Sequence, residues 1–242
     1  MIVIAESKRW DVDLADKLKK NLLERQLNQE IVSIYQKEDL NLENLERLSP
    51  DFIFFPHWSH MIPEAVFSRF TCIVFHMTDL PFGRGGSPLQ NLISRGIYET
   101  KISALRCEAG IDTGPVYLKK SLSLHGSAQE IYIRASKIIK EMMIEIVQEK
   151  IQPKPQQGEP VVFKRRTPAQ SEIDSKKLDS LKKLDSLEKL FDQIRMLDAE
   201  GYPKAFIELG DFKFEFSRAS FCGEQIISDV KIMKKNRESS HD

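Results

Sequence analysis

Short apolar runs alternate with helix-patterned segments from the N-terminus to His76, and this alternation constrains the fold more than any other feature of the chain. Strand-like runs are expected at residues 2–5, 30–35, 51–55 and 72–75, with helices at residues 13–24, 41–48 and 63–69. Such alternation predicts a parallel, doubly wound sheet. Sites in sheets of this kind collect at the carboxyl ends of the strands, where His57, Trp58 and His76 stand.

The rest of the chain follows a different pattern. Residues 101–107 and 116–122 are expected to form strands on either side of Asp112, as an antiparallel pair. Residues 127–150 predict a long helix, because Ser127 suits its N-cap and Glu130 completes a capping box. Residues 151–160 are rich in turn formers and predict a linker, which a short strand at residues 161–163 follows. Residues 194–220 predict a turn and two short strands.

The predicted fold class is α/β. A doubly wound, Rossmann-like and mostly parallel sheet is expected in residues 1–170, with a small α+β appendage of a helix and a β-hairpin in residues 171–242. The helix is expected within residues 175–190, where the hexapeptide KKLDSL occurs twice and leucines recur at every third position. We interpret it as a docking helix rather than a coiled coil. Together with the apolar strand near residues 212–216, it predicts a homodimer.

Composition restricts the partners of the chain. The 36 Lys and Arg residues balance 36 Asp and Glu residues, so no net charge attracts nucleic acid, and we expect no nucleic-acid partner. The three cysteines are scattered, which favours a reducing compartment. The N-terminus does not resemble a signal peptide, and no apolar run is long enough to span a bilayer. A cytoplasmic location without a membrane partner is therefore expected.

Two polar loops join strand-like segments and hold groups that can catalyse a reaction. The first, in residues 75–96, reads FHMTDLPFGRGGSPLQNLISRG and contains His76; the second, in residues 108–117, reads EAGIDTGPVY and contains Asp112. An imidazole can exchange protons near neutral pH, and a neighbouring carboxylate can orient it. The purely structural alternatives are a core histidine that is hydrogen-bonded to a carbonyl group and an aspartate that only forms a turn.

The order H-x-x-x-L-P-x-x-R-G followed by D-x-G resembles the folate-dependent formyltransferases. The resemblance implies an N-formyltransferase that uses N10-formyltetrahydrofolate as co-substrate, with His76 and Asp112 as catalytic residues. It also implies that Thr78, Asp79, Leu80 and Pro81 lie against the folate, and Arg84 and Gly85 belong to the same expected site. Members of the family commonly carry Asn two positions before the histidine, where its amide can stabilise an oxyanion. This chain has Val74 there, which cannot donate a hydrogen bond.

The run GRGGSPLQNLI most resembles enzymes that formylate amino sugars on nucleotide carriers. We therefore expect the acceptor to be a UDP- or dTDP-linked 4-amino-4,6-dideoxyhexose, with a UDP-linked precursor of pseudaminic acid favoured. A methionyl-tRNA formyltransferase is the alternative within the family, disfavoured by the neutral charge and the short C-terminal region. Hydrolysis of the formyl folate, a non-catalytic folate- or nucleotide-binding module and an assembly protein remain as further readings.

Two aromatic residues are candidates for binding the substrate. Trp58 follows the third expected strand and suits stacking on a base or a pterin, although packing at the domain rim explains it equally well. Tyr202 is a weaker candidate for stacking on a nucleotide. His57 and His60 are spaced like metal ligands, but no third ligand is evident, so no metal is expected.

Overall fold

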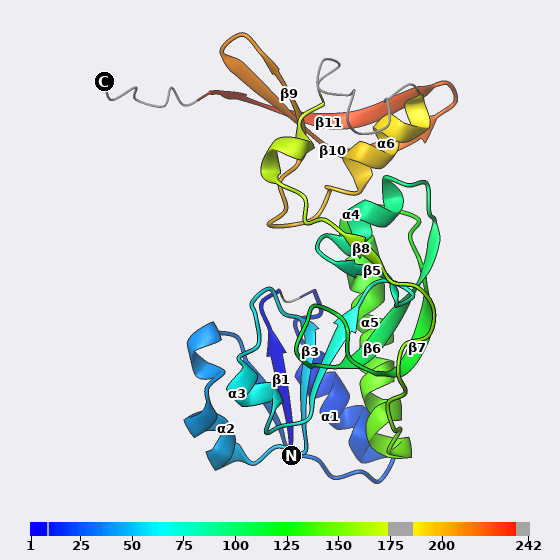
Figure 1. The fold of residues 1–242 in the computed structure, drawn as a ribbon. Coiled ribbons are helices and arrows are strands. Elements are labelled where there is room, and N and C mark those ends of the chain that lie inside the picture. Colours follow the sequence, from blue (N-terminus) through cyan, green and yellow to red (C-terminus); the bar gives the residue numbers. More distant parts are fainter. Residues whose placement is uncertain (9, 174–185, 236–242) are drawn as a thin grey trace. The chain divides into compact units, whose positions relative to one another are not determined.

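The computed structural model describes residues 1–8, 10–173 and 186–235, and Figure 1 shows its helices and strands. The chain divides into two compact units. The first unit comprises Met1–Pro88, Glu99–Ser123 and Tyr132–Lys164, and the second comprises Leu89–Tyr98, Leu124–Ile131 and Arg165–Asp242. A domain boundary at residue 170 and a homodimer stay predictions.

The first unit is built on a six-stranded sheet with the order β2-β1-β3-β4-β6-β7. Its parallel strands are β1 (Ile2–Glu6), β2 (Ile31–Ile34), β3 (Phe52–His57) and β4 (Cys72–His76). β6 (Glu99–Arg106) and β7 (Val116–Ser123) continue the sheet as antiparallel strands. The helices are α1 (Leu14–Glu24), α2 (Leu42–Leu48), α3 (Glu64–Phe67) and, from Tyr132 onwards, the long α5 (Ala128–Glu149), and residues Lys37–Asp39 form a 3-10 turn. The predicted α/β fold class is confirmed.

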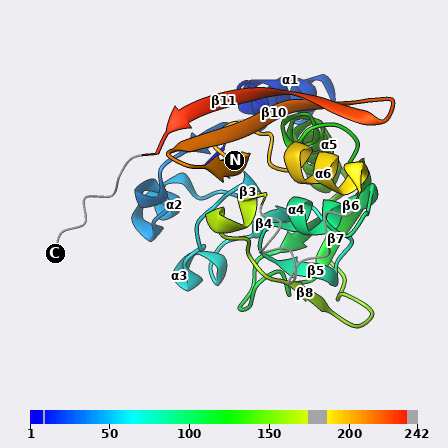
Figure 2. The ribbon, with the colours of Figure 1, turned by 90° about the horizontal axis from the view of Figure 1, so that it is seen from above.

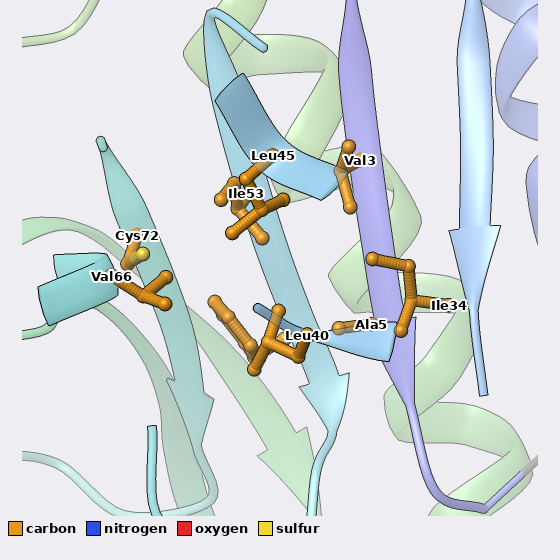
Figure 3. Packing of buried hydrophobic residues seen from close by; sticks show 9 residues of the cluster. Val3, Ala5, Ile34, Leu40, Leu45, Ile53, Val66 and Cys72 are labelled. Atoms are coloured by element: carbon orange, nitrogen blue, oxygen red, sulfur yellow. The ribbon is translucent and has the colours of Figure 1, made fainter. Parts of the chain in front are cut away.

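Side chains alternate between the two faces of the central strands. On one face Val3, Ala5, Ile53 and Cys72 pack with Leu45 of α2 and Val66 of α3, as Figure 3 shows. The opposite face carries Ile2, Ile4 and Phe54, all fully buried. Because both faces are covered, these strands are nearly continuous apolar runs, which is why the sequence identified them.

Residues next to both ends of α1 contact α5. The Nη1 atom of Arg25 donates a 2.7 Å hydrogen bond to Oε1 of Gln148, and the rings of Trp10 and Tyr132 stack with centroids 4.8 Å apart. The predicted capping box of α5 is present, because Oε2 of Glu130 accepts from the backbone N–H of Ser127 and Oγ of Ser127 accepts from the N–H of Glu130.

A two-stranded parallel sheet lies beside the expected site. Strand β5 (Phe82–Gly85) pairs with β8 (Val161–Phe163), and helix α4 (Pro88–Ile93) follows β5. Only β8 was expected from the sequence. Strand β5 was missed because its sequence, FGRG, contains two glycines and is short of the β-branched residues typical of strands.

The second unit contains α6 (Leu187–Arg195) and an antiparallel sheet of three strands, β9 (Ala205–Leu209), β10 (Phe212–Cys222) and β11 (Gln225–Lys234), in the order β11-β10-β9. Residues Pro168–Ser171 form a 3-10 turn. Helix α6 packs against β10, and Figure 2 shows β10 and β11 as a long hairpin. The expectation of two strands missed β11, an edge strand with many polar residues. Of the expected leucine helix, residues 175–185 lie outside the described residues, and α6 begins at Leu187.

Hydropathy gives one further fact about the helices. Among the residues that the structure describes, no helix combines the length and the apolar composition that crossing a membrane requires.

Candidate active site

His76 and Asp112 come together in the first unit. His76 is the last residue of β4 and is buried, and Asp112 lies in the loop between β6 and β7. The Nδ1 atom of His76 lies 3.4 Å from Oδ2 of Asp112, and Nε2 lies 2.7 Å from the carbonyl oxygen of Gly83. Both ring nitrogens therefore face acceptors. A ring nitrogen that carries a hydrogen can donate it to the acceptor that it faces.

The Asp112 loop is held by close backbone contacts. Asp112 itself has a φ of 55°, in the left-handed region that aspartate tolerates better than most residues. A Cβ atom on Gly114 would lie 1.9 Å from the carbonyl oxygen of Arg106, so only glycine fits there. The Oδ2 atom of Asp112 also accepts a 2.9 Å hydrogen bond from the backbone N–H of Gly85. The carboxylate thus connects the loop to β5 as well as to β4.

Arg84 does not point at an acidic partner within the described contacts. Its Nε and Nη2 atoms donate to Oε1 of Gln156, at 3.1 and 2.8 Å. Nε2 of the same glutamine donates to the carbonyl oxygens of Asp112 and Gly114, both at 2.8 Å. The sequence reading missed Gln156, because it lies in the Pro- and Gln-rich segment 151–160, which carries no periodic pattern.

The Thr78-Asp79-Leu80-Pro81 segment is tied into the first unit. Oγ of Ser103 donates to the carbonyl oxygen of Thr78 at 2.7 Å, and the carbonyl oxygen of Pro81 accepts from Val161 at 3.2 Å. Thr78 and Leu80 are buried, and the Leu80-Pro81 peptide bond is cis. The main-chain groups of this loop are thus largely satisfied within the protein.

A charged cluster surrounds Asp79. Its carboxylate lies 2.9 Å from Nζ of Lys101 and 2.6 Å from Nζ of Lys119. Burial by itself would raise the pKa of Asp79, but hydrogen bonds and attraction from the two lysines lower it overall. The three side chains remain partly exposed, and their formal charges leave the cluster with one net positive charge.

Trp58 and His57 pack at the end of β3. Trp58 contacts the rings of Phe55 and His60, with centroids 6.0 and 5.2 Å apart, and its Nε1 atom is buried without a hydrogen-bond partner among the described residues. His57 places Nε2 2.7 Å from Oγ of Ser136, and burial lowers the pKa of His57 to about 4. In the described residues no three potential metal ligands come together.

Two other residues discussed from the sequence have clear positions. Val74 lies in β4 between Phe55 of β3 and Leu105 of β6 and packs against the apolar cluster of Figure 3. Its side chain is therefore part of the packing and offers no hydrogen bond. Tyr202 belongs to the second unit, where its backbone N–H donates to the carbonyl oxygen of Ala199 at 3.3 Å.

Family comparisons match both parts of the chain. The family model described as formyl transferase matches residues 2–147, and that of the methionyl-tRNA formyltransferase C-terminal domain matches residues 168–233. A curated relative, the methionyl-tRNA formyltransferase of Francisella tularensis subsp. novicida, is 29% identical over 149 residues, which are 59% of this chain and 48% of that protein. The chain thus spans about half the length of the curated relatives it matches.

Solved structures extend the comparison. A methionyl-tRNA formyltransferase from Clostridium thermocellum is 50% identical, with a TM-score of 0.89, and the match covers 97% of this chain and 99% of that one. HypX from Aquifex aeolicus in complex with tetrahydrofolic acid is 18% identical, with a TM-score of 0.69, over 90% of this chain and 37% of that one. A sugar N-formyltransferase from a Shewanella species is 14% identical, with a TM-score of 0.64, over 94% and 95% of the chains. The last two show likeness of fold alone.

The expected acceptor is wrong. The match at 50% identity, the C-terminal family model and the curated relatives all carry the name methionyl-tRNA formyltransferase, which contradicts both the nucleotide-linked amino sugar and the exclusion of a nucleic-acid partner. Two arguments failed. The short C-terminal region is shared by the Clostridium thermocellum protein, which matches almost end to end. Balanced net charge is a sum over the chain, and it does not exclude local contacts to phosphates.

The expected family is confirmed, because the first of these models covers more than half of the chain and extends across the His76 and Asp112 loops. The chain belongs to the formyl transferase family.

Proposed function

We propose that this chain transfers the formyl group of N10-formyltetrahydrofolate to the amino group of methionine carried by a tRNA. The observation that carries the proposal is the likeness along nearly the whole chain, at 50% identity, to a structure named methionyl-tRNA formyltransferase. The match of residues 168–233 to the C-terminal domain of methionyl-tRNA formyltransferases supports the same acceptor.

The residues around His76 suit formyl transfer. The attacking amine must lose a proton, the formyl oxygen becomes negatively charged in a tetrahedral intermediate, and the folate nitrogen must gain a proton as it leaves. In this proposal His76 handles the protons, and Asp112 orients its ring through Nδ1. Since Val74 offers no donor, the positive charge that His76 gains with the proton from the amine takes part in stabilising the oxyanion, and His76 then gives that proton to the departing folate nitrogen.

The charged cluster suits the folate. The glutamyl tail of a folate ends in carboxylates, and the net positive charge of Lys101, Lys119 and Asp79 is complementary to them. The cluster adjoins the Leu80-Pro81 segment, since Nζ of Lys119 donates to the carbonyl oxygen of Leu80 at 2.5 Å. In this proposal the lysines hold the tail, and Thr78, Arg84 and Gly85 shape the loop beside His76.

Turnover with matched acceptors tests the proposal. The purified protein would receive N10-formyltetrahydrofolate with methionyl-tRNA, uncharged tRNA or free methionine, and release of tetrahydrofolate would be followed. We expect release only with methionyl-tRNA, lost in His76→Asn and retained in His60→Asn, which changes an exposed histidine. Release without any amine would identify a hydrolase, and folate binding without release would identify a non-catalytic module; either result rejects the proposal.

A further inference from the structure

We propose that Gln156 is a positioning residue for formyl transfer, which holds Asp112 in place against His76. The inference rests on the proposed function for its kinetic consequences. It concerns a side chain far along the sequence from the H-x-x-x-L-P-x-x-R-G and D-x-G motifs, in the segment that the sequence suggested was only a linker.

The side-chain amide of Gln156 has all its hydrogen-bonding positions occupied. Its two N–H groups donate to the carbonyl oxygens of Asp112 and Gly114, and its oxygen accepts twice from the guanidinium of Arg84. The chemistry fixes this orientation. Turning the amide over would direct its oxygen at two carbonyl oxygens and its N–H groups at the N–H groups of Arg84, so that all four contacts would become repulsive.

These bonds support a loop that needs support from outside. The backbone of Asp112 is in the left-handed region, with a φ of 55°, which costs free energy that surrounding contacts must offset. Gln156 binds the carbonyl oxygen of Asp112, while the carboxylate of the same residue accepts from Gly85 and faces His76. Backbone and side chain of Asp112 are thus each held by a hydrogen bond from outside the loop, and the carboxylate faces Nδ1 of His76.

The segment that carries Gln156 is fixed on both sides of it. Lys154 and Val116 exchange two backbone hydrogen bonds, of 2.8 and 2.9 Å, and β8 begins to pair with β5 at Val161. Because its backbone is already ordered, fixing Gln156 costs only the conformational entropy of its side chain, which four hydrogen bonds offset. The paired strand, β5, is also the one that supplies Arg84 and Gly85. The segment, itself held on both sides, therefore supports the Asp112 loop through Gln156.

Substitutions at two neighbouring glutamines separate this role from a general effect. Gln156→Leu removes all four hydrogen bonds at similar size, and Gln156→Glu keeps the acceptor but turns a carboxylate towards two carbonyl oxygens. The matched controls are Gln157→Leu and Gln157→Glu, at an exposed position. We expect both Gln156 variants to lower kcat roughly 10- to 100-fold with KM for the folate changed less than about threefold. The controls should stay within about twofold of the wild type.

A double-mutant cycle tests whether Gln156 acts through Asp112. In an Asp112→Asn background, Gln156→Leu should lower kcat by less than about threefold, because the side chain it positions has already lost its charge. Equal losses in both backgrounds would overturn the proposal, because a merely structural contribution is independent of the charge on Asp112.

A spectroscopic readout needs no substrate. The ring nitrogens of His76, identified by the signals that vanish in His76→Gln, should shift in the nitrogen-15 spectra of Gln156→Leu and Gln156→Glu but not of Gln157→Leu. Unmoved signals in a folded Gln156 variant would overturn the positioning role. If the wild-type protein transfers no formyl group to methionyl-tRNA, the proposed function fails, and the ring signals still decide whether Gln156 positions the pair.

Discussion

One carboxylate oxygen of Asp112, Oδ2, lies 3.4 Å from Nδ1 of His76 and at the same time accepts the 2.9 Å hydrogen bond of the Gly85 backbone. The hydrogen bond from the backbone N–H of Gly85 fixes the position of this oxygen. The imidazole therefore faces a carboxylate that is held in place and does not rotate away. A histidine next to a carboxylate is common in proteins. Here a single carboxylate oxygen contacts both β4 and β5 from the β6–β7 loop, which is a more specific arrangement. The contribution of the negative charge of Asp112 can therefore be tested by substitution.

Asp112→Asn should therefore reduce catalysis strongly while the protein stays folded. The amide oxygen can still accept from Gly85, but the negative charge facing His76 is lost. We expect kcat to fall on the order of a hundred- to ten-thousand-fold, the range of general acid–base effects. The measurement is the single-turnover rate of formyl transfer, with Asp16→Asn at an exposed position as control. A loss below about threefold would show that Asp112 only forms the turn.

Gly114→Ala should destabilise the protein more than a glycine substitution in open space. The new methyl group would lie 1.9 Å from the carbonyl oxygen of Arg106, so the loop must move, whereas Gly96, with a φ of 71°, has no atom within 4 Å of an added Cβ. We expect about 1 kcal/mol for Gly96→Ala, from its backbone conformation, and at least 2 to 3 kcal/mol (roughly) for Gly114→Ala. Urea unfolding measures both. Equal losses would mean that the loop adapts freely.

The burial of His57 predicts a loss of stability in mild acid. Its pKa is lowered to about 4 in the folded protein, so between pH 6.5 and pH 4 the unfolded chain binds a proton that the folded chain does not. Stability contributed by the neutral ring is therefore present above pH 6.5 and is lost as the pH falls, by up to about 3 kcal/mol.

Unfolding free energies at pH 7 and pH 5 measure this contribution. His57→Gln, which can still donate to Ser136, should flatten the pH dependence, and His60→Gln should leave it as in the wild type. An unchanged slope in His57→Gln would show that other groups cause the loss.

Burial also predicts very different reactivities for the three thiols. It raises the pKa of Cys72 to about 12 and that of Cys107 to about 11, where the carboxylates of Asp112 and Glu108 add to the effect, while Cys222 is exposed. At pH 8 roughly one Cys72 in ten thousand and one Cys107 in a thousand is a thiolate, the reactive form. A disulfide reagent should modify one thiol quickly in the folded protein and three after unfolding. Two fast thiols in the folded protein would contradict the protection of the buried Cys72 and the half-buried Cys107.

The sequence predicted most strands and helices of the first unit, and the start of α5, because they follow local patterns. Buried parallel strands such as Ile2–Glu6 are continuous apolar runs, and Ser127 with Glu130 signals the start of a helix. His76 and Asp112 were singled out from loop motifs, and the structure places them together. Their catalytic role stays a prediction.

What the sequence did not reveal depends on contacts between distant segments. No local sequence pattern identifies Gln156, because its importance comes from hydrogen-bond partners in β5 and in the Asp112 loop. Strand β5 forms because β8 pairs with it, not because Phe82–Gly85 prefers to be extended. The acceptor was misjudged for a related reason. The motif loops describe the formyl-transfer site shared by a family, and they carry little information about the molecule that brings the amine.

Because a chain is synthesised from its N-terminus, Gln156 is added after the residues that it binds. Gln156 follows Asp112 by 44 positions, so at roughly 5–20 residues per second it leaves the ribosome about two to nine seconds later. In that interval the nascent protein already holds His76 and Asp112 but lacks the side chain that binds the Asp112 loop. A chain truncated before residue 156 would therefore contain both motif residues but lack the hydrogen bonds by which Gln156 holds the Asp112 loop.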